Sequence, residues 1–313
     1  MLSRDELQGF IPPMVTPLKA NGAIDKAGFQ RVVTHHLEGG ANGLFVLGST
    51  GEGPSLSDSR AAEVVAETVR LSDGRVPVLA GIIGCSFERI LEKARLAAET
   101  GADAVVATTP VYYDIYRDAE ILDYYRRLAE EAPLPVVIYN IPAATQVKIA
   151  PKVLQELASV SSILGVKDST GDWAHFQQIL FRCREDPNFK VMQGKEELSG
   201  ASLIFGADGI VSGIGNLHPR LATDLYRAGS RGDVEATQAL QKQMDELFRV
   251  IKGRPWLLAI KTAMNLLGLC KATATRPFDR LEEQDVREIE AVLQENGLSI
   301  KDVDEKVEEE PTA

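Results

Sequence analysis

The amino-acid sequence predicts an α/β protein with the (β/α)8 TIM barrel fold and a C-terminal helical extension. Short apolar runs rich in β-branched residues recur through the first 215 residues, and each is followed by a longer segment with helical periodicity. Eight such units occur. Strand–helix alternation implies parallel strands joined by crossover helices, and eight units favour a closed barrel over the alternative, an open doubly wound sheet.

The predicted strands begin about 20 to 35 residues apart, which leaves room for one strand, one helix and two loops in each unit. They are IPPMV at 11, GLFVL at 43, VPVLAGI at 76, DAVVA at 103, PVVIY at 135, SILGV at 162, FKVMQ at 189 and DGIVS at 208. Three strands follow a glycine (Gly40, Gly101 and Gly206) that suits the left-handed C-cap of the preceding helix.

Beyond residue 217 the pattern changes from alternating strands and helices to helices alone. The predicted helices lie near 219–229, 232–251, 255–268 and 282–296. The first of them completes the barrel, so the predicted division is a barrel over 1–230 and a helical appendage over 231–297. The remaining residues, 298–313, end in KDVDEKVEEEPTA, and so polar a run predicts a disordered acidic tail.

Composition and charge restrict the partners that we expect. A net charge of -11 and a pI near 5.0 disfavour nucleic acid and anionic membranes, because phosphate binding requires clustered Lys and Arg. The N-terminus lacks the apolar stretch of a signal peptide, and no long apolar run predicts a membrane span. Cys85, Cys183 and Cys270 are widely separated and form no CxxC motif. We therefore expect a cytoplasmic protein with reduced thiols.

Lys167 is the first candidate for a catalytic residue. In this fold the catalytic groups lie at the C-terminal ends of the strands, and Lys167 directly follows the buried run SILGV. Burial disfavours the charged form of an amine, and the neutral amine is the nucleophile that forms a Schiff base with a carbonyl. The structural alternative is an ammonium group that reaches solvent or pairs with Asp168.

Two other strand ends carry groups that a Schiff-base lysine needs. Tyr139 closes the preceding strand, and its hydroxyl can transfer protons during carbinolamine formation and dehydration, although a tyrosine at the rim is the alternative. Ser49, Thr50 and Gly51 follow the second strand in GSTGE, whose hydroxyls and backbone amides suit a carboxylate. The same residues also fit a turn that caps the next helix.

Metal and cofactor motifs are absent from the sequence. It contains no P-loop, no dinucleotide-binding motif and no zinc-protease motif. His35, His36, His175 and His218 are not spaced as a set of metal ligands, so we interpret them as structural or surface residues. We expect neither a metal nor a bound cofactor.

Together, the motifs GSTGE, TPVYY, YNIP and GVKDSTGD resemble those of the dihydrodipicolinate synthase and N-acetylneuraminate lyase superfamily of pyruvate-dependent class I aldolases. The resemblance extends over nearly the whole chain. It implies that Lys167 forms the Schiff base, that Tyr139 transfers protons, and that Thr50 links Tyr139 to Tyr113 of a neighbouring subunit. It also implies a homotetramer, built as a dimer of dimers, that acts on pyruvate and an aldehyde.

The resemblance assigns further residues to the substrate. Ser49, Thr50 and Gly51 correspond to the loop that holds the pyruvate carboxylate. Val211 matches the position whose backbone oxygen approaches the substrate, and Ser212 follows it. Glu196 could accept hydrogen bonds from substrate hydroxyls, and a solvated carboxylate at a helix N-terminus is the alternative.

Ala144 is the main departure from the pattern of the superfamily. Synthases of the lysine pathway place an arginine at this position, where it grips the carboxylate of the aldehyde substrate. The chain therefore resembles more closely the aldolases that cleave or form 2-keto-3-deoxy sugar acids. A condensation of pyruvate with aspartate semialdehyde and a dehydration of a 2-keto-3-deoxy sugar acid are the alternatives. A non-catalytic barrel is the third reading.

Overall fold

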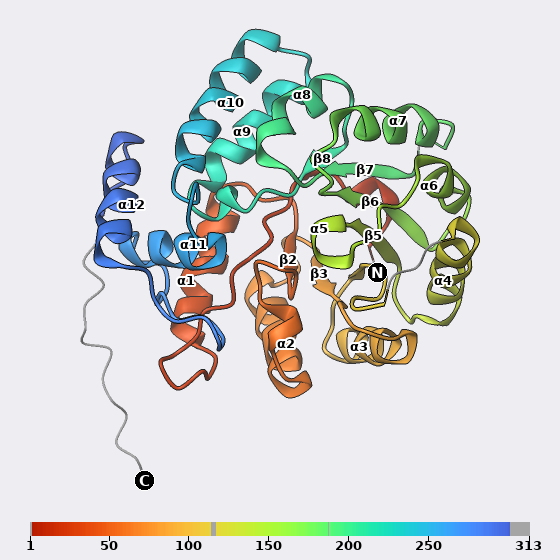
Figure 1. Ribbon diagram of the computed structural model, residues 1–313, viewed down its shortest axis with the longest axis horizontal. Helices are drawn as coiled ribbons and strands as arrows, with labels where there is room; N and C mark the ends of the chain where they lie inside the picture. The colour runs from red at the N-terminus through yellow and green to blue at the C-terminus, as the bar shows by residue number, and fades with distance from the viewer. Residues whose placement is uncertain (1, 114–116, 187, 301–313) are drawn as a thin grey trace.

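The computed structural model describes residues 2–113, 117–186 and 188–300 (Figure 1). In these ranges eight parallel strands form one curled sheet, in the order β1-β8-β7-β6-β5-β4-β3-β2. The strands are β1 (Gly9–Phe10), β2 (Leu44–Val46), β3 (Val78–Gly81), β4 (Ala104–Ala107), β5 (Val136–Asn140), β6 (Ile163–Asp168), β7 (Lys190–Gln193) and β8 (Gly209–Ile210).

Seven of these strands coincide with predicted runs, whereas the first does not. The prediction of a strand at IPPMV was wrong, because β1 ends at Phe10. Pro12 and Pro13 have no N–H to donate, so they interrupt the ladder of hydrogen bonds. The chain still approaches β2 after β1: Phe45 N donates to Pro12 O at 3.0 Å, and Met14 N donates to Phe45 O at 2.8 Å.

The helices surround the sheet and continue beyond it (Figure 1). The α-helices are α1 (Lys26–Glu38), α2 (Asp58–Ser72), α3 (Phe87–Glu99), α4 (Asp118–Glu131), α5 (Pro142–Thr145), α6 (Pro151–Ala158), α7 (Trp173–Cys183), α8 (Ser199–Ile204), α9 (Pro219–Ser230), α10 (Val234–Phe248), α11 (Trp256–Leu266) and α12 (Glu283–Glu295). Short 3-10 helices are η1 (Arg4–Glu6), η2 (Gly53–Ser55), η3 (Glu196–Leu198) and η4 (Ile214–Asn216). The four predicted C-terminal helices match α9 to α12.

Local sequence signals fix several of these boundaries. Gly40, Gly101 and Gly206 have φ angles of 85°, 93° and 93°, the left-handed conformation predicted for them. Ser57 caps α2 by accepting a hydrogen bond from Arg60 N. The alternative in which Ser49 or Thr50 caps this helix is therefore wrong.

The apolar side chains form two layers, one inside the curled sheet and one between the sheet and the helices. The inner layer includes Ile11, Phe45, Val106, Met192 and Val211. The outer layer includes residues of the barrel and of the C-terminal helices, among them Phe176, Leu225, Met244, Leu247, Ile260, Met264 and Leu293. The C-terminal helices thus share one apolar core with the sheet and its surrounding helices.

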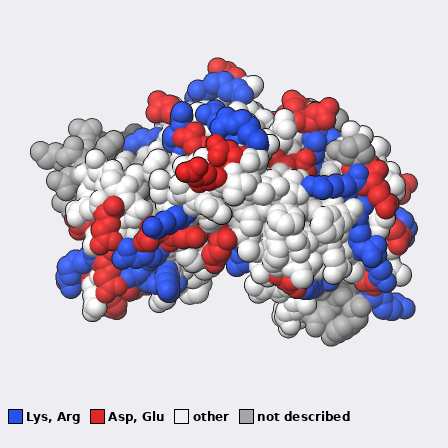
Figure 2. Space-filling model, turned by 90° about the horizontal axis from the view of Figure 1, so that it is seen from above, with Lys and Arg blue, Asp and Glu red and all other residues white. Residues whose placement is uncertain are grey.

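Leu298 and Ile300 pack against the outer layer, and residues 301–313 of the predicted tail lie outside the described residues. None of the described helices is long and apolar enough to cross a membrane. On the face drawn in Figure 2, basic and acidic side chains are interspersed around a broad area without charged residues.

Candidate active site

Lys167 lies near the C-terminal end of β6 and points into the interior of the curled sheet. Its side chain is 6% exposed and lines a small internal cavity together with Phe45, Met192 and Val211. Gly194 packs against the lysine stem, because a Cβ atom at that position would lie 3.0 Å from Lys167 Cε. The amine end of the side chain is thus surrounded mainly by apolar groups.

A β-bulge in β6 directs Lys167 inward. Val136 of β5 pairs with Ile163, but Val137 pairs with Gly165, so Leu164 is an extra residue in β6. Leu164 belongs to the inner layer. If side chains alternated strictly between the two faces from Leu164 onward, Lys167 would point toward the helices. The extra residue shifts this alternation by one position, so Lys167 points inward.

The nearest groups to the Lys167 amine are aromatic. Tyr139 is the pairing partner of Lys167 in β5, and Nζ lies 4.0 Å from the centroid of its ring. The Phe45 ring centroid is 5.1 Å from the same atom. Among the described residues, no carboxylate pairs with Lys167. Among the described residues, the amine therefore lies against two aromatic rings and has no hydrogen-bond partner.

Asp168 is not a partner of Lys167 among the described residues, so the pairing considered from the sequence is wrong. Its carboxylate accepts hydrogen bonds from Asn140 Nδ2 and Thr170 Oγ1, both at 2.7 Å. Burial is the main cause that raises the pKa of Asp168 to about 6. Asn140 Oδ1 in turn accepts a hydrogen bond from Ile149 N, so this network fixes the ends of β5 and β6 behind the lysine.

The loop of residues 47–53 follows β2 and contains the GSTGE motif. Thr16 Oγ1 donates to Gly51 O at 2.6 Å, and Gly53 N donates to Gly48 O at 3.1 Å. In the part of the chain that the structure describes, the backbone amides of Ser49, Thr50 and Gly51 have no hydrogen-bond acceptor. Three successive free amides form a site suited to a carboxylate.

The segment after β8 is held by Glu196. Its Oε1 accepts hydrogen bonds from Gly213 N at 2.6 Å and from Ser212 Oγ at 3.4 Å. Burial is the main cause that raises the pKa of Glu196 above its ordinary value. Val211 N donates to Gln193 O at 2.8 Å, which leaves Val211 beside the lysine cavity. Glu196 thus anchors the segment that carries two predicted substrate-binding residues.

Asn216 joins this segment to the N-terminal part of the sheet. Its Nδ2 donates to Pro13 O at 3.0 Å and to Gly213 O at 2.9 Å. His36 Nε2 lies 3.3 Å from Asn216 Oδ1, and His35 Nε2 lies 3.1 Å from Asn216 O. The two histidines therefore support the chain behind the site, in agreement with their interpretation as structural residues.

Tyr113 is the predicted site residue that the single chain does not bring to Lys167. Its side chain is 72% exposed, and its ring lies edge-on to Tyr112 with centroids 5.0 Å apart. No hydrogen bond among the described residues joins Thr50 to either tyrosine of the predicted relay. The relay through a neighbouring subunit stays a prediction.

Two buried residues near the site were not identified from the sequence. Glu52, within GSTGE, forms an ion pair with Lys261 of α11, and both side chains are almost fully buried. The sequence did contain a signal for this pair. Lys261 interrupts the apolar run WLLAIKTAM, and lysine is almost never fully buried unless it is paired.

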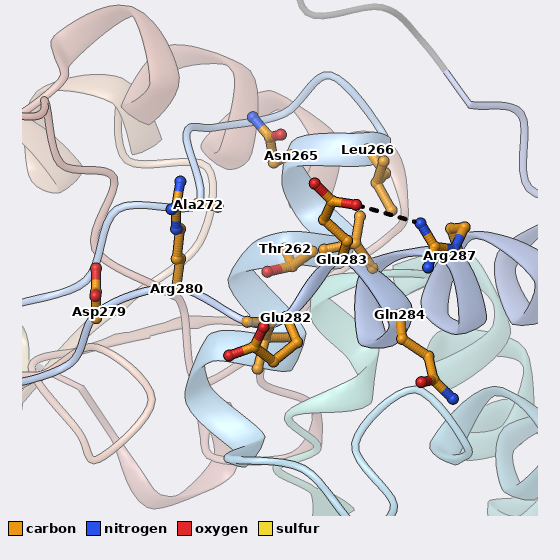
Figure 3. Close-up of a pocket in the computed structure, with 12 residues that line it drawn as sticks. Thr262, Asn265, Leu266, Ala272, Asp279, Arg280, Glu282, Glu283, Gln284 and Arg287 are labelled. Carbon is orange, nitrogen blue, oxygen red and sulfur yellow. Dashed lines mark hydrogen bonds and ion pairs between the residues drawn. The ribbon is translucent and has the colours of Figure 1, made fainter.

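A larger pocket lies away from Lys167, between α11 and α12 (Figure 3). Its volume is about 1020 Å³, and Thr262, Asn265 and Arg280 contribute to its lining. Figure 3 shows Glu283 and Arg287, which form an ion pair at 3.5 Å, beside it. Among the described residues, no group of three His, Cys, Asp or Glu side chains could hold a metal ion.

Comparisons with known proteins support the resemblance seen in the motifs. The model of the dihydrodipicolinate synthetase family matches residues 6–296. A 4-hydroxy-tetrahydrodipicolinate synthase of Jannaschia sp. (strain CCS1) is 34% identical over 291 residues, which cover 93% of this chain and 99% of the relative.

Solved structures agree with the family match. Dihydrodipicolinate synthase from Bacteroides thetaiotaomicron has a TM-score of 0.89 and 36% identity, and the match covers 94% of this chain and 100% of that one. YagE, a prophage protein of Escherichia coli K12 solved in complex with pyruvate, has a TM-score of 0.87 and 29% identity, with 93% and 99% covered. The chain described here belongs to the dihydrodipicolinate synthetase family, whose members are pyruvate-dependent class I enzymes that act through a Schiff base.

Proposed function

We propose that Lys167 is the residue that forms the Schiff base with pyruvate. The observation that carries this proposal is the position of Nζ, which lies inside the curled sheet, 4.0 Å from the Tyr139 ring centroid and without a carboxylate partner among the described residues. An amine that makes no hydrogen bond to the protein is available to attack a carbonyl carbon.

The surrounding groups supply the remaining parts of the reaction. The Lys167 amine adds to the ketone carbon of pyruvate, and the resulting carbinolamine loses water to give the Schiff base. The Tyr139 hydroxyl transfers the protons in these steps. The amides of Ser49, Thr50 and Gly51 hold the pyruvate carboxylate, and the Val211 carbonyl faces the bound substrate. Loss of a methyl proton then gives the enamine that adds to an aldehyde.

We also propose a closed (β/α)8 barrel and a homotetramer for the active protein. The hydrogen bonds between residues 12–14 and Phe45 support closure, because they join the chain after β1 to β2. The exposed pair Tyr112 and Tyr113 supports a site completed by a neighbouring subunit, since two adjacent tyrosines are rarely left in solvent without a partner.

Two aldehyde partners are consistent with these roles. Condensation with aspartate semialdehyde is favoured by the names of the relatives, which are 4-hydroxy-tetrahydrodipicolinate synthases. Formation or cleavage of a 2-keto-3-deoxy sugar acid is favoured by Ala144, an exposed residue of α5 that offers no charge to a second carboxylate.

Borohydride trapping tests the assignment of Lys167. Reduction in the presence of pyruvate should attach a three-carbon adduct to the peptide that contains Lys167, and peptide mass spectrometry should locate it. The Lys167→Met variant should remain unmodified while it stays folded. An unmodified wild-type protein, or an adduct on another lysine, would refute the assignment.

The same preparation separates the two aldehyde partners. Pyruvate release from a panel of 2-keto-3-deoxy sugar acids is compared with pyruvate consumption in the presence of aspartate semialdehyde. We expect kcat/KM for a 2-keto-3-deoxy sugar acid to exceed that for aspartate semialdehyde by at least about tenfold, since a missing charge-assisted contact costs of the order of 1.4 kcal/mol or more. Strong activity with the semialdehyde would show that Ala144 does not exclude it.

A further inference from the structure

A buried ion pair links the 47–53 loop to the C-terminal helices. Glu52 and Lys261 are separated by more than two hundred positions in sequence, and their side chains are 1% and 0% exposed. Lys261 Nζ also donates to Thr273 O at 2.5 Å, and Thr275 N donates to Glu52 Oε2 at 2.6 Å. Besides their ion pair, both side chains thus form hydrogen bonds to the backbone of the segment that follows α11.

Stability alone does not account for this pair. Removing two charges from water is costly, and well-packed apolar side chains often replace a buried ion pair without loss of stability. Lys261 lies in a helix whose residues 257–264 are all buried, so an apolar side chain would fit its surroundings. A buried ion pair of this kind can instead hold the backbone in one particular arrangement.

The arrangement that it holds is the unusual backbone of the 47–53 loop. Leu47 and Glu52 have φ angles of 59° and 58°, a left-handed conformation that side-chain-bearing residues rarely adopt. Gly53 and Gly81 pack directly on Leu47 O, since Cβ atoms there would lie at 1.9 and 2.3 Å from it. The close contacts of Gly53 and Gly81 hold Leu47 at the start of the loop, and the ion pair holds Glu52 near its end.

The residues between these two ends are Ser49, Thr50 and Gly51, whose amides have no acceptor in the described chain. Glu52 directly follows Gly51, so a change in the Glu52 backbone would turn these amides. An unpaired carboxylate at this depth would move toward water, and it would carry the loop with it.

We propose that the Glu52–Lys261 ion pair positions the 47–53 loop to bind the substrate carboxylate, which makes Lys261 a positioning residue located in the C-terminal helices. This inference rests on the proposed function, in which the loop binds pyruvate. It predicts that loss of the pair weakens pyruvate binding and leaves the reactivity of Lys167 largely intact, because Lys167 and Tyr139 are held by other contacts.

The test measures borohydride trapping of Lys167 over a range of pyruvate concentrations in the full-length protein. Lys261→Met should raise the half-saturating pyruvate concentration at least tenfold and change the trapping rate at saturation less than threefold. Glu52→Gln, which keeps the shape of the side chain, should shift the half-saturation in the same direction.

Arg254→Met is the matched control. Arg254 pairs with Asp285 and Glu288 within the C-terminal helices, and none of its hydrogen bonds or ion pairs among the described residues reaches the loop. This variant should lower the thermal stability and leave the half-saturating pyruvate concentration within twofold of the wild type.

Each outcome decides between the alternatives. Unchanged half-saturation in a folded Lys261→Met or Glu52→Gln variant overturns the positioning role, as does an equal rise in Arg254→Met. If both pair variants fail to fold while Arg254→Met folds, the pair is a folding element and the proposal is wrong. A wild-type protein that forms no adduct refutes the proposed function itself, and this inference with it.

Discussion

Gly165 is the residue on which the position of Lys167 depends most directly. A Cβ atom at Gly165 would lie 2.2 Å from Lys190 O of the neighbouring strand, and backbone atoms cannot move aside as a flexible side chain can. Glycine therefore allows β6 to approach β7 immediately after the bulge at Leu164.

Gly165→Ala should separate β6 from β7 and displace Lys167. We expect a loss of stability of about 1 to 3 kcal/mol, typical of overpacking, together with reduced trapping of pyruvate. Chemical denaturation and borohydride trapping measure the two effects. Gly43→Ala is the control, because its Cβ would meet only side chains at 3.4 Å or more. Equal behaviour of the two variants would contradict the steric argument.

At this scale the sequence predicted which strand ends carry candidate residues, but it could not predict how their side chains meet. Lys167 and Tyr139 became candidates because polar groups directly follow apolar runs. Their mutual position depends on the pairing register of β5 and β6, and a one-residue bulge cannot be recognised before the partner strand is known. The contact with Phe45 was not predicted, because Phe45 lies on β2, which pairs with neither β5 nor β6.

Among the secondary-structure elements, α1 and η4 form a contact that depends on pH. Burial lowers the pKa of His36 to about 3, whereas an unfolded histidine has a pKa of about 6.5. The unfolded chain therefore binds a proton below pH 6.5 that the folded chain does not bind. The stability linked to His36 is complete above pH 6.5 and is lost progressively as the pH falls toward 3.

His36→Gln should weaken this pH dependence. Between pH 7 and pH 5 the wild type should lose about 2 kcal/mol more stability than the variant, since each pH unit below 6.5 contributes about 1.4 kcal/mol. Urea denaturation of both proteins at the two pH values measures the difference, and the other titrating groups cancel in the comparison. If both proteins lost the same amount of stability between pH 7 and pH 5, His36 would have to become protonated in the folded state.

The elements themselves were predictable where local signals are strong. Seven strands and the four C-terminal helices lie where periodicity placed them, and Gly40, Gly101 and Gly206 adopt the expected conformation. The first strand was misplaced because its apolar character outweighed the two prolines in the prediction. The role of Asn216 depends on segments that are distant in sequence, so no local pattern indicated it.

For the whole molecule, the shared apolar core predicts that the barrel region does not fold without the C-terminal helices. Truncation after residue 230 removes Met244, Leu247, Ile260 and Met264 from the outer layer and leaves Glu52 without Lys261. Each of these apolar side chains contributes about 1.5 to 3 kcal/mol, and their sum is comparable with a typical net stability of about 5 to 15 kcal/mol.

Circular dichroism and thermal unfolding test this expectation. The full-length protein should unfold in one transition, and a chain of residues 1–230 should be insoluble or lack cooperative unfolding. A soluble truncated chain that unfolds cooperatively would show that the two parts are independent domains. The sequence predicted the number of C-terminal helices, but the packing of their apolar faces on the sheet required the tertiary structure.

The bulge at Leu164 also affects how related sequences are compared. A strand has only two faces, and the extra residue lets Leu164 and Lys167 both face the interior of the sheet although three positions separate them. A relative that lacks this residue must orient either its lysine or the residues before the bulge differently, even where the GVKDSTGD letters align. The length of β6 is therefore a second feature, besides the motif, that a comparison with relatives has to match.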